Sequence, residues 1–325
     1  MTRSAERDLL AVAGLAVSGL ALASVMSART SQPRIAPPRR AITARRDAGQ
    51  RSVTVSAARK LNTAAGTLAV SVLADSAVEH YRGSFKNKAM YTPLVVSALT
   101  LATSLHGTAD MRPLAHRARD ATYLLAAATG LIGTGFHLYN IGKKVGGFCW
   151  QNLFYGAPIG APMAILLSGL LGFCSERVRE TDRPRSRPEI FRLPAGRTIA
   201  AVAGAGLLGT SGEAGLLHFR GAYHNPFMMV PVTLPPIGAA LLMSAASGRR
   251  GPAHRLTRWW MRLLALMGFA GVGFHAYGVS RNMGGWRNWS QNILNGPPLP
   301  APPSFAGLAL AGLAALGLMR EHPDA

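Results

Sequence analysis

Long apolar stretches separated by short polar segments dominate this chain. The hydrocarbon core of a bilayer is about 30 Å thick, so an α-helix needs roughly 20 mainly apolar residues to cross it. Nine stretches approach that length, and none shows the two-residue alternation typical of a membrane barrel strand. The pattern therefore predicts an all-α integral membrane protein. The nine stretches lie near residues 9–28, 61–80, 90–107, 121–140, 158–174, 198–218, 227–247, 259–278 and 304–319.

The composition agrees with this pattern and excludes several other classes of protein. Hydrophobic residues make up 49% of the 325 residues and charged residues 15%, whereas a soluble domain carries about 25% charged residues. Lys and Arg outnumber Asp and Glu by 35 to 14, but they are scattered over several loops and do not form one base-reading surface. Two cysteines are too few for a disulfide scaffold or a four-cysteine metal site. We therefore expect a lipid bilayer as partner and no nucleic acid.

Basic residues are divided unequally between the two alternating sets of loops. The segments 29–60, 107–120, 175–197, 248–258 and 320–325 together carry 24 Lys and Arg, and the loops of the opposite side carry 10. Basic loops stay on the cytoplasmic side of a membrane. We therefore expect a multi-pass protein of a bacterial-type inner (plasma) membrane, with the N- and C-termini of its core in the cytoplasm.

The first apolar stretch, residues 9–28, has three interpretations. It is a retained helix, a signal peptide with Ala21-Leu22-Ala23 before the cleavage site, or the product of a misassigned start upstream of Met26. Cleavage would export the nine basic residues of 29–60, against the charge rule. We favour an extra N-terminal helix followed by a mobile, basic cytoplasmic linker. The two together make up residues 1–60.

The chain also repeats itself at an offset of 138 residues, with shared residues of rare types. After a two-residue insertion, Gln151-Asn152 matches Gln291-Asn292. A constant offset over such a length indicates an internal duplication. The earlier matches include His80 with His218, Arg82 with Arg220, Asn87 with Asn225, Met90 with Met228, and Gly135-Phe136-His137 with Gly273-Phe274-His275.

The duplication predicts eight core transmembrane helices in two four-helix repeats, in addition to the N-terminal helix. Repeat 1 covers 61–174, a basic cytoplasmic linker covers 175–197, repeat 2 covers 198–319, and a tail covers 320–325. Because four spans are an even number, both repeats cross the membrane in the same direction, related by an axis along the membrane normal. Small residues mark positions where helices can approach closely. These are Gly130, Gly133, Gly268 and Gly271.

The four duplicated histidines are candidate ligands at the extracytoplasmic ends of the spans. His80 pairs naturally with His137, and His218 with His275. Two imidazoles from facing helices can hold a haem iron, and all four together could gather one metal ion. Contact with a quinone or another substrate, and plain hydrogen bonding between helices, remain open. We expect haem b or a quinone as cofactor. The predicted site also includes Arg82, Arg220, Tyr139 and Tyr277.

Two acidic residues lie deeper in the predicted spans, at equivalent positions. Asp75 and Glu213 each precede a duplicated histidine by five residues. A carboxylate in hydrocarbon is costly unless it is protonated or paired. Arg82 and Arg220 lie seven residues further on, on the same helix face. Three roles would explain the two acidic residues: an ion pair with these arginines, an ion pair with a histidine of the third span, or a proton relay. The relay is our catalytic hypothesis.

The outer loops suggest contact with the membrane surface or with a partner. Residues 142–162 and 280–302 are rich in Gly and Pro and contain Trp150, Trp286 and Trp289. Tryptophan is enriched where a membrane meets water, so an interfacial aromatic belt is one interpretation. A docking surface or lid is the other, since the loops are long for plain connections.

Three hypotheses for function follow. No phosphate-binding loop, nucleophile elbow or zinc-protease motif is present in the sequence. At the level of architecture alone, two four-helix halves with a polar outer site look like the quinone-interacting anchor subunits of periplasmic oxidoreductases. The leading hypothesis is a membrane redox subunit that meets quinone or haem and a periplasmic electron-transfer partner or another membrane subunit; whether it is an enzyme or a non-catalytic subunit of an oxidoreductase stays open. The first alternative is a small-ion or proton-coupled transporter or channel, favoured by Asp75, Glu213 and a helix break at Pro235-Pro236. The second is a structural anchor for a partner.

Overall fold

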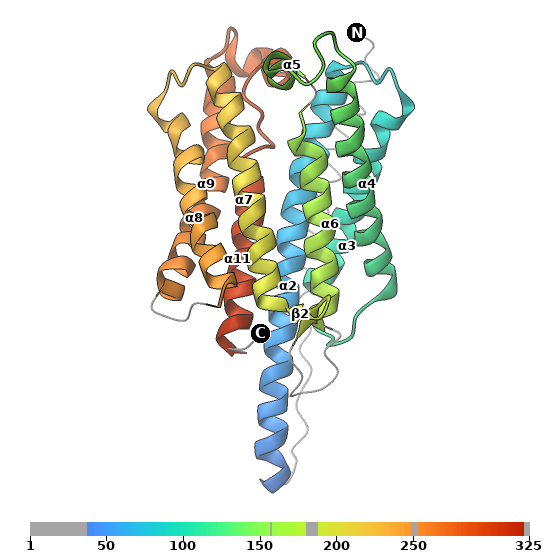
Figure 1. Ribbon diagram of the computed structural model, residues 1–325, viewed down its shortest axis with the longest axis vertical. Helices are drawn as coiled ribbons and strands as arrows, with labels where there is room; N and C mark the ends of the chain where they lie inside the picture. Colours follow the sequence, from blue (N-terminus) through green and yellow to red (C-terminus); the bar gives the residue numbers. More distant parts are fainter. Residues whose placement is uncertain (1–37, 157, 180–187, 249–252, 322–325) are drawn as a thin grey trace.

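The computed structural model is built almost entirely of α-helices and describes residues 38–156, 158–179, 188–248 and 253–321. The predicted N-terminal helix over 9–28 lies outside the described residues. Eight long helices run side by side along the length of the molecule (Figure 1). They are α2 (Pro38–Arg82), α3 (Thr92–Ala109), α4 (Arg117–Gly142), α6 (Gly160–Arg179), α7 (Ala195–Arg220), α8 (Val230–Ala246), α9 (Ala253–Arg281) and α11 (Pro303–Glu321).

Seven of these helices, all except α3, contain a segment long and apolar enough to cross a membrane. The search for such segments covers the described residues only. Helix α3 has the required 18 residues, but six of them are serine or threonine and one is His106, so it is less apolar. By length and composition, the protein is a multi-pass membrane protein with an all-α fold.

Short elements lie at the two ends of the long helices. One end, called the α5 end here, carries α5 (Trp150–Tyr155), α10 (Trp289–Asn295) and the 3-10 turns η1 (Lys88–Tyr91), η2 (Pro226–Met229) and η3 (Gly285–Asn288). The opposite end, called the hairpin end, carries strands β1 (Glu189–Ile190) and β2 (Leu193–Pro194). They pair antiparallel, Glu189 opposite Pro194 and Ile190 opposite Leu193.

The long helices pack as two groups of four (Figure 1). In the first half, α2 and α4 each contact both α3 and α6, so α2 and α4 lie on a diagonal. In the second half, α7 and α9 each contact both α8 and α11. The halves meet where α2 packs against α11 and α6 against α7. The most buried residues lie in these four central helices, as expected for a bundle with a lipid-exposed rim.

Small residues make the close helix contacts possible, as their positions in the sequence predict. A Cβ atom at Gly130 would collide with the Leu166 backbone of α6, and one at Gly268 would come within 2.7 Å of the Ala306 nitrogen of α11. Added Cβ atoms at Gly133 and Gly271 would meet Pro162 and Pro302 at 3.2 Å and 2.7 Å. Van der Waals contact between backbones is the main attraction between helices in lipid, so these glycines determine how closely α4 and α9 pack.

The structure differs from the predicted linker over residues 29–60. Helix α2 begins at Pro38, and Val55, Ala58 and Leu61 bury one of its faces in the core. Arg59 lies inside this helix, and its Nε donates a hydrogen bond to the Thr108 carbonyl of α3 at 2.6 Å. The apolar positions three residues apart continue upstream of residue 61, so the helix does too. Its first turns extend beyond the hairpin end of the bundle (Figure 1).

The linker predicted over 175–197 is also shorter than expected. Helix α6 continues to Arg179, and α7 already begins at Ala195. Glu176 and Arg179 are buried in the last turn of α6. Between the helices, the β1–β2 hairpin buries Ile190 against the core. The described ends of this basic segment therefore belong to the folded body.

The helix break predicted at Pro235-Pro236 is wrong. Helix α8 runs through both prolines without interruption. A proline has no N–H, so Pro235 leaves the carbonyl of Pro231, four residues earlier, without its helical partner. Ser211 of α7 donates its hydroxyl to that carbonyl at 3.1 Å. Polar side chains of neighbouring helices commonly satisfy such groups in membranes.

Candidate functional site

Two corners of matching geometry position the first histidine of each half. After α2, Ser84 and Phe85 have φ of 57° and 45°, and after α7, Ala222 and Tyr223 have φ of 53° and 47°. Residues other than glycine rarely adopt this left-handed backbone conformation, which costs about 1–3 kcal/mol per residue. The same unusual conformation at positions 138 residues apart shows that both corners hold a defined shape.

An asparagine follows each corner and begins the next 3-10 turn. Asn87 Oδ1 accepts a hydrogen bond from the Ala89 N–H at 2.9 Å, and Asn225 Oδ1 accepts one from the Phe227 N–H at 3.0 Å. These caps place the carbonyls of Met90 and Met228 beside the ends of α2 and α7. The corners therefore bring a backbone acceptor to each histidine.

All four predicted histidines use Nδ1 to contact a backbone carbonyl. Nδ1 of His80 lies 2.6 Å from the Met90 oxygen, and that of His218 lies 2.9 Å from the Met228 oxygen. In the same way, His137 contacts the Pro158 oxygen at 2.5 Å, and His275 contacts the Pro298 oxygen at 2.6 Å. A carbonyl only accepts hydrogen bonds, so Nδ1 carries the proton and Nε2 keeps its lone pair in the neutral ring.

The histidines lie in pairs at the α5 end, one pair in each half. The ring centres of His218 and His275 are 6.4 Å apart, with ring planes at 72°. His80 lies close enough to His137 for their charges to interact. Because α2 and α4 are diagonal, as are α7 and α9, each pair spans the interior of its own four-helix group. The structure therefore brings the rings of His218 and His275 together, as the sequence predicts.

A single metal centre built by all four histidines does not form. Within the described ranges, no three side chains of His, Cys, Asp or Glu lie close enough together to hold a metal ion. Each histidine pair instead belongs to its own helix group. Any ligand would therefore be held by two imidazoles at a time.

The two predicted arginines differ in their contacts, and neither pairs with a carboxylate two turns earlier. Arg82 Nη1 donates to Glu79 Oε1 at 2.5 Å. The position equivalent to Glu79 is Leu217 in the second half, and Arg220 stacks on the ring of Phe154, with its guanidinium carbon 4.9 Å from the ring centre. A direct ion pair of Arg82 with Asp75, or of Arg220 with Glu213, is one of the possibilities that the sequence left open, and the described residues do not form it.

Glu213 instead joins the two halves. Its Oε1 accepts a hydrogen bond from the backbone N–H of Gly160, the first residue of α6, at 3.0 Å. A Cβ at position 160 would overlap the Glu213 carboxylate, so this contact requires a glycine. The equivalent position in the second half is Pro300, which has no N–H to donate.

Asp75 therefore has no equivalent cap. Ser71, one turn earlier on α2, donates instead to the Pro300 carbonyl, and its hydroxyl lies 2.9 Å from that of Ser304. Asp75 forms no hydrogen bond or ion pair with any described residue, and it lies near enough to Glu213 for the two charges to repel. The two carboxylates thus share the contact region between the halves. The other two predicted residues, Tyr139 and Tyr277, remain 62% and 63% exposed on their helices.

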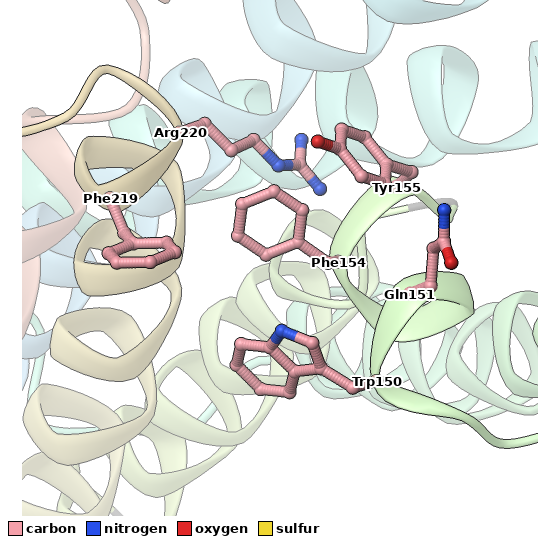
Figure 2. Close-up of a pocket in the computed structure, with 6 residues that line it drawn as sticks. All are labelled: Trp150, Gln151, Phe154, Tyr155, Phe219 and Arg220. Atoms are coloured by element: carbon pink, nitrogen blue, oxygen red, sulfur yellow. The ribbon is translucent and has the colours of Figure 1, made fainter.

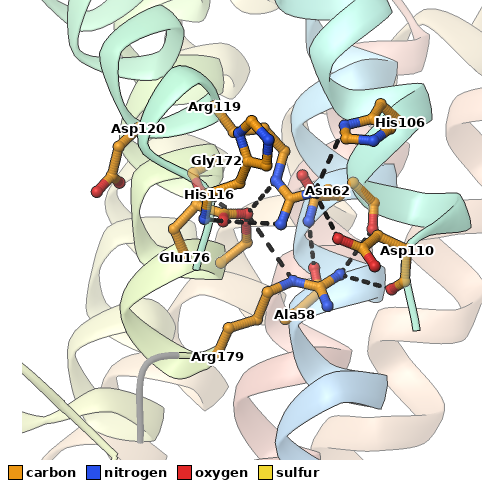
Figure 3. Close-up of polar contacts among 12 residues, drawn as sticks. Ala58, Asn62, His106, Asp110, His116, Arg119, Asp120, Gly172, Glu176 and Arg179 are labelled. Atoms are coloured by element: carbon orange, nitrogen blue, oxygen red, sulfur yellow. Dashed lines mark hydrogen bonds and ion pairs between the residues drawn. The ribbon is translucent and has the colours of Figure 1, made fainter. Parts of the chain in front are cut away.

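A buried ionic cluster at the hairpin end was missed by the sequence analysis (Figure 3). Arg119 of α4 donates Nε and Nη2 to the Glu176 carboxylate at 2.9 Å and 3.0 Å, and Nη1 to Asp110 Oδ2 at 2.8 Å. Arg179 donates to the carbonyls of Gly107, Asp110 and Arg112 at 2.6–3.0 Å. Two arginines and two carboxylates therefore neutralise one another while almost fully buried.

The cluster also alters the acidity of Asp110, which follows the last residue of α3. Burial alone would raise the pKa of Asp110, but hydrogen bonds from Arg112 and Arg119 outweigh it and hold this pKa well below its usual range. The described residues of the second half form no such cluster. Its equivalent residues are Gly248 for Asp110, Thr257 for Arg119, Leu316 for Glu176 and Met319 for Arg179. Two features of the sequence could have indicated this cluster: these residues depart from the repeat, and the acidic Glu176 follows an apolar stretch.

Comparison of this chain with protein-family models, with curated proteins and with solved structures finds no match. The proposals below therefore rest on the geometry and chemistry of the residues described above.

Proposed function

We propose that this chain is a membrane subunit of a redox system that binds haem b at its extracytoplasmic face. His80 and His137 would hold one haem iron, and His218 and His275 another. The observation that carries the proposal is that all four Nδ1 atoms contact backbone carbonyls. Metal-bound histidines use their second nitrogen in this way, which fixes the ring and leaves Nε2 for the metal.

The distance within the second pair supports the same proposal. The ring centres of His218 and His275 lie 6.4 Å apart, so these two imidazoles would be close enough to hold one iron through their Nε2 atoms. When bound, haem supplies one-electron chemistry. The imidazoles and the corners that orient them are this chain's contribution.

We further propose that the eight long helices all cross the membrane, as two parallel four-helix repeats, with the α5 end outside. The charge difference between alternating loops supports this orientation. The matched corners and histidine hydrogen bonds support a duplication. Both termini of the described core then lie in the cytoplasm. A periplasmic electron-transfer partner would meet the α5 end.

The carboxylates near the contact between the halves fit a role in proton movement. Asp75 and Glu213 lie within reach of each other's charge and five residues inward from a histidine. Two neighbouring carboxyl groups favour sharing one proton. A relay through Asp75 and Glu213 would accompany electron transfer at the outer face.

One observation favours the second candidate, an anchor for a partner protein. Apolar side chains at the α5 end are strongly exposed, including Val145 at 100% and Met283 at 91%. Large exposed apolar surfaces mark contact with protein or membrane. The transporter hypothesis has lost the broken helix that favoured it.

An optical spectrum of the detergent-purified protein, produced in cells supplied with haem precursors, tests the haem proposal. We expect a reduced-minus-oxidised haem spectrum and two haems per chain by pyridine haemochrome assay. His218→Gln keeps an N–H for the Met228 carbonyl but offers no imidazole, so it should lower the content to one haem. His224→Ala is the matched control, since His224 also contacts a carbonyl, that of Gly221 at 3.0 Å, but has no histidine partner. Protein that is folded and free of haem would refute the proposal.

A further inference from the structure

A cavity of about 480 Å³ opens at the α5 end, between the two halves (Figure 2). Helix α5 of the first half supplies four of its lining residues, and the last turn of α7 in the second half supplies two. Its volume lies within the usual range of small-molecule sites. The lining residues are Trp150, Gln151, Phe154, Tyr155, Phe219 and Arg220.

Aromatic rings form most of the wall. Phe154 packs edge-on against Phe219 at 5.8 Å between ring centres, and its ring centre lies 5.9 Å from that of Trp150. Phe154 is buried, whereas Trp150 and Tyr155 are 68% and 67% exposed. The cavity therefore has a buried aromatic floor and an open aromatic rim, which suits a flat ring.

Arg220 is the single charged group of this wall, and its hydrogen-bond donors are available. Its guanidinium carbon lies 4.9 Å from the ring centre of Phe154 and 5.6 Å from that of Tyr155. In the described part of the chain, it makes no ion pair or hydrogen bond, unlike Arg82, which is paired with Glu79. A guanidinium stacked on a ring keeps its N–H groups in its own plane, so Arg220 can donate to an oxygen of a ligand.

The duplication does not explain this arrangement. In the second half, the residues equivalent to Trp150, Phe154 and Tyr155 are Ser290, Leu294 and Asn295. The unpaired arginine also occurs only once, because Leu217 replaces the acidic residue that neutralises Arg82. Rings and arginine therefore come together at one of the two contacts between the halves and not at the other.

We propose that this cavity binds the headgroup of a lipid-soluble quinone. The biological role of such binding rests on the proposed redox function, whereas the geometric argument for it does not. A quinone is a flat ring with carbonyl oxygens at its edge. Its ring can lie against the aromatic wall of the cavity, where Arg220 donates a hydrogen bond to one carbonyl. The cavity lies at the end of membrane-spanning helices, so a ligand dissolved in the bilayer can reach it.

Quenching of tryptophan fluorescence by duroquinone tests binding in the purified full-length chain. We expect saturable quenching that is largely lost in Trp150→Phe, since that residue lines the cavity and the other four tryptophans do not. Arg220→Gln should weaken the apparent affinity about tenfold or more, the loss expected when a charged hydrogen bond disappears. Arg281→Gln, at an exposed arginine that ends α9 and does not line the cavity, should bind within twofold of the unaltered protein.

Other outcomes would overturn the assignment. Quenching that never saturates, or an affinity unchanged in Arg220→Gln, means that no quinone site exists here. Competition by benzoate, a flat ring that carries a carboxylate, at lower concentration than duroquinone would show a site for aromatic anions instead. If Arg220→Gln fails to fold by circular dichroism, Arg220→Lys keeps the charge without the planar fork and should still lose affinity. Haem content is measured separately, so a chain without haem that binds duroquinone refutes the haem proposal alone.

Discussion

Replacing Glu176 with leucine is expected to destabilise the protein strongly. Glu176 is fully buried and accepts hydrogen bonds from two nitrogens of Arg119 and from the His116 N–H at 2.8 Å. Without it, the charge on Arg119 is balanced by Asp110 alone, and Arg179 loses its nearest carboxylate at 3.8 Å. Removing one partner from a buried ion pair costs about 3–5 kcal/mol, mostly because the remaining charge is uncompensated.

The second half of the chain offers a matched control for this change. Its apolar version of the cluster can be transferred as the quadruple variant Asp110→Gly, Arg119→Thr, Glu176→Leu and Arg179→Met. Replacing a whole buried ionic group by packed apolar residues is often neutral or stabilising. The quadruple variant should therefore recover most of the stability that the single substitution loses.

Unfolding in mixed micelles with increasing SDS, followed by circular dichroism, measures both effects as free energies. Two results would contradict the reasoning. A loss below about 1 kcal/mol for Glu176→Leu would mean that the ion pairs contribute little. A quadruple variant less stable than the single one would mean that the charges support the fold in themselves.

Three further predictions concern other regions. Ser211→Ala removes the donor to the Pro231 carbonyl and should cost about 1–3 kcal/mol in the same assay, whereas exposed Ser247→Ala should change stability by less than about 0.5 kcal/mol; equal effects would contradict this. The pKa of Asp110 is depressed in the folded protein, so its contribution to stability is complete above the unfolded pKa of about 3.9 and is lost as the pH falls further. The free energy of unfolding should therefore decline less steeply below pH 4 in Asp110→Asn than in the unaltered protein. A membrane-impermeant maleimide should label Cys149 in intact cells but not the buried Cys174, and labelling of Cys149 only after cell lysis would reverse the orientation.

The fold was largely predictable because its signals are local. Apolar length indicates the long helices, and glycines such as Gly130 and Gly268 indicate where backbones touch. The histidine pairs followed from the internal repeat, since residues preserved at a constant offset come to equivalent places. None of these inferences needed the position of a side chain relative to another helix.

The remaining features depend on contacts between distant segments. Arg119 and Arg179 lie in segments whose basic residues are fully explained by membrane topology. The number of basic residues in these segments therefore did not indicate that these two arginines are buried. The partners of Glu213 and Pro231 come from another helix, and a sequence does not reveal which backbone groups lie opposite them. The long first turns of α2 were missed because the arginines of residues 29–60 were read as a linker.

The hydrogen bonds from the four imidazoles also bear on when a ligand can be acquired. His80 and His218 lose their rotational freedom when the two corners fold, since their acceptors on Met90 and Met228 belong to the protein itself. His137 and His275 lose it when the segments before α6 and α11 fold, which supply the acceptors on Pro158 and Pro298. The conformational entropy of the rings is therefore given up during folding and not during binding, which favours tight binding. Such a chain can insert into the membrane and fold first and take up its ligand afterwards. If the proposed haem is bound, ligand-free protein would be an assembly intermediate with an intact α5 end.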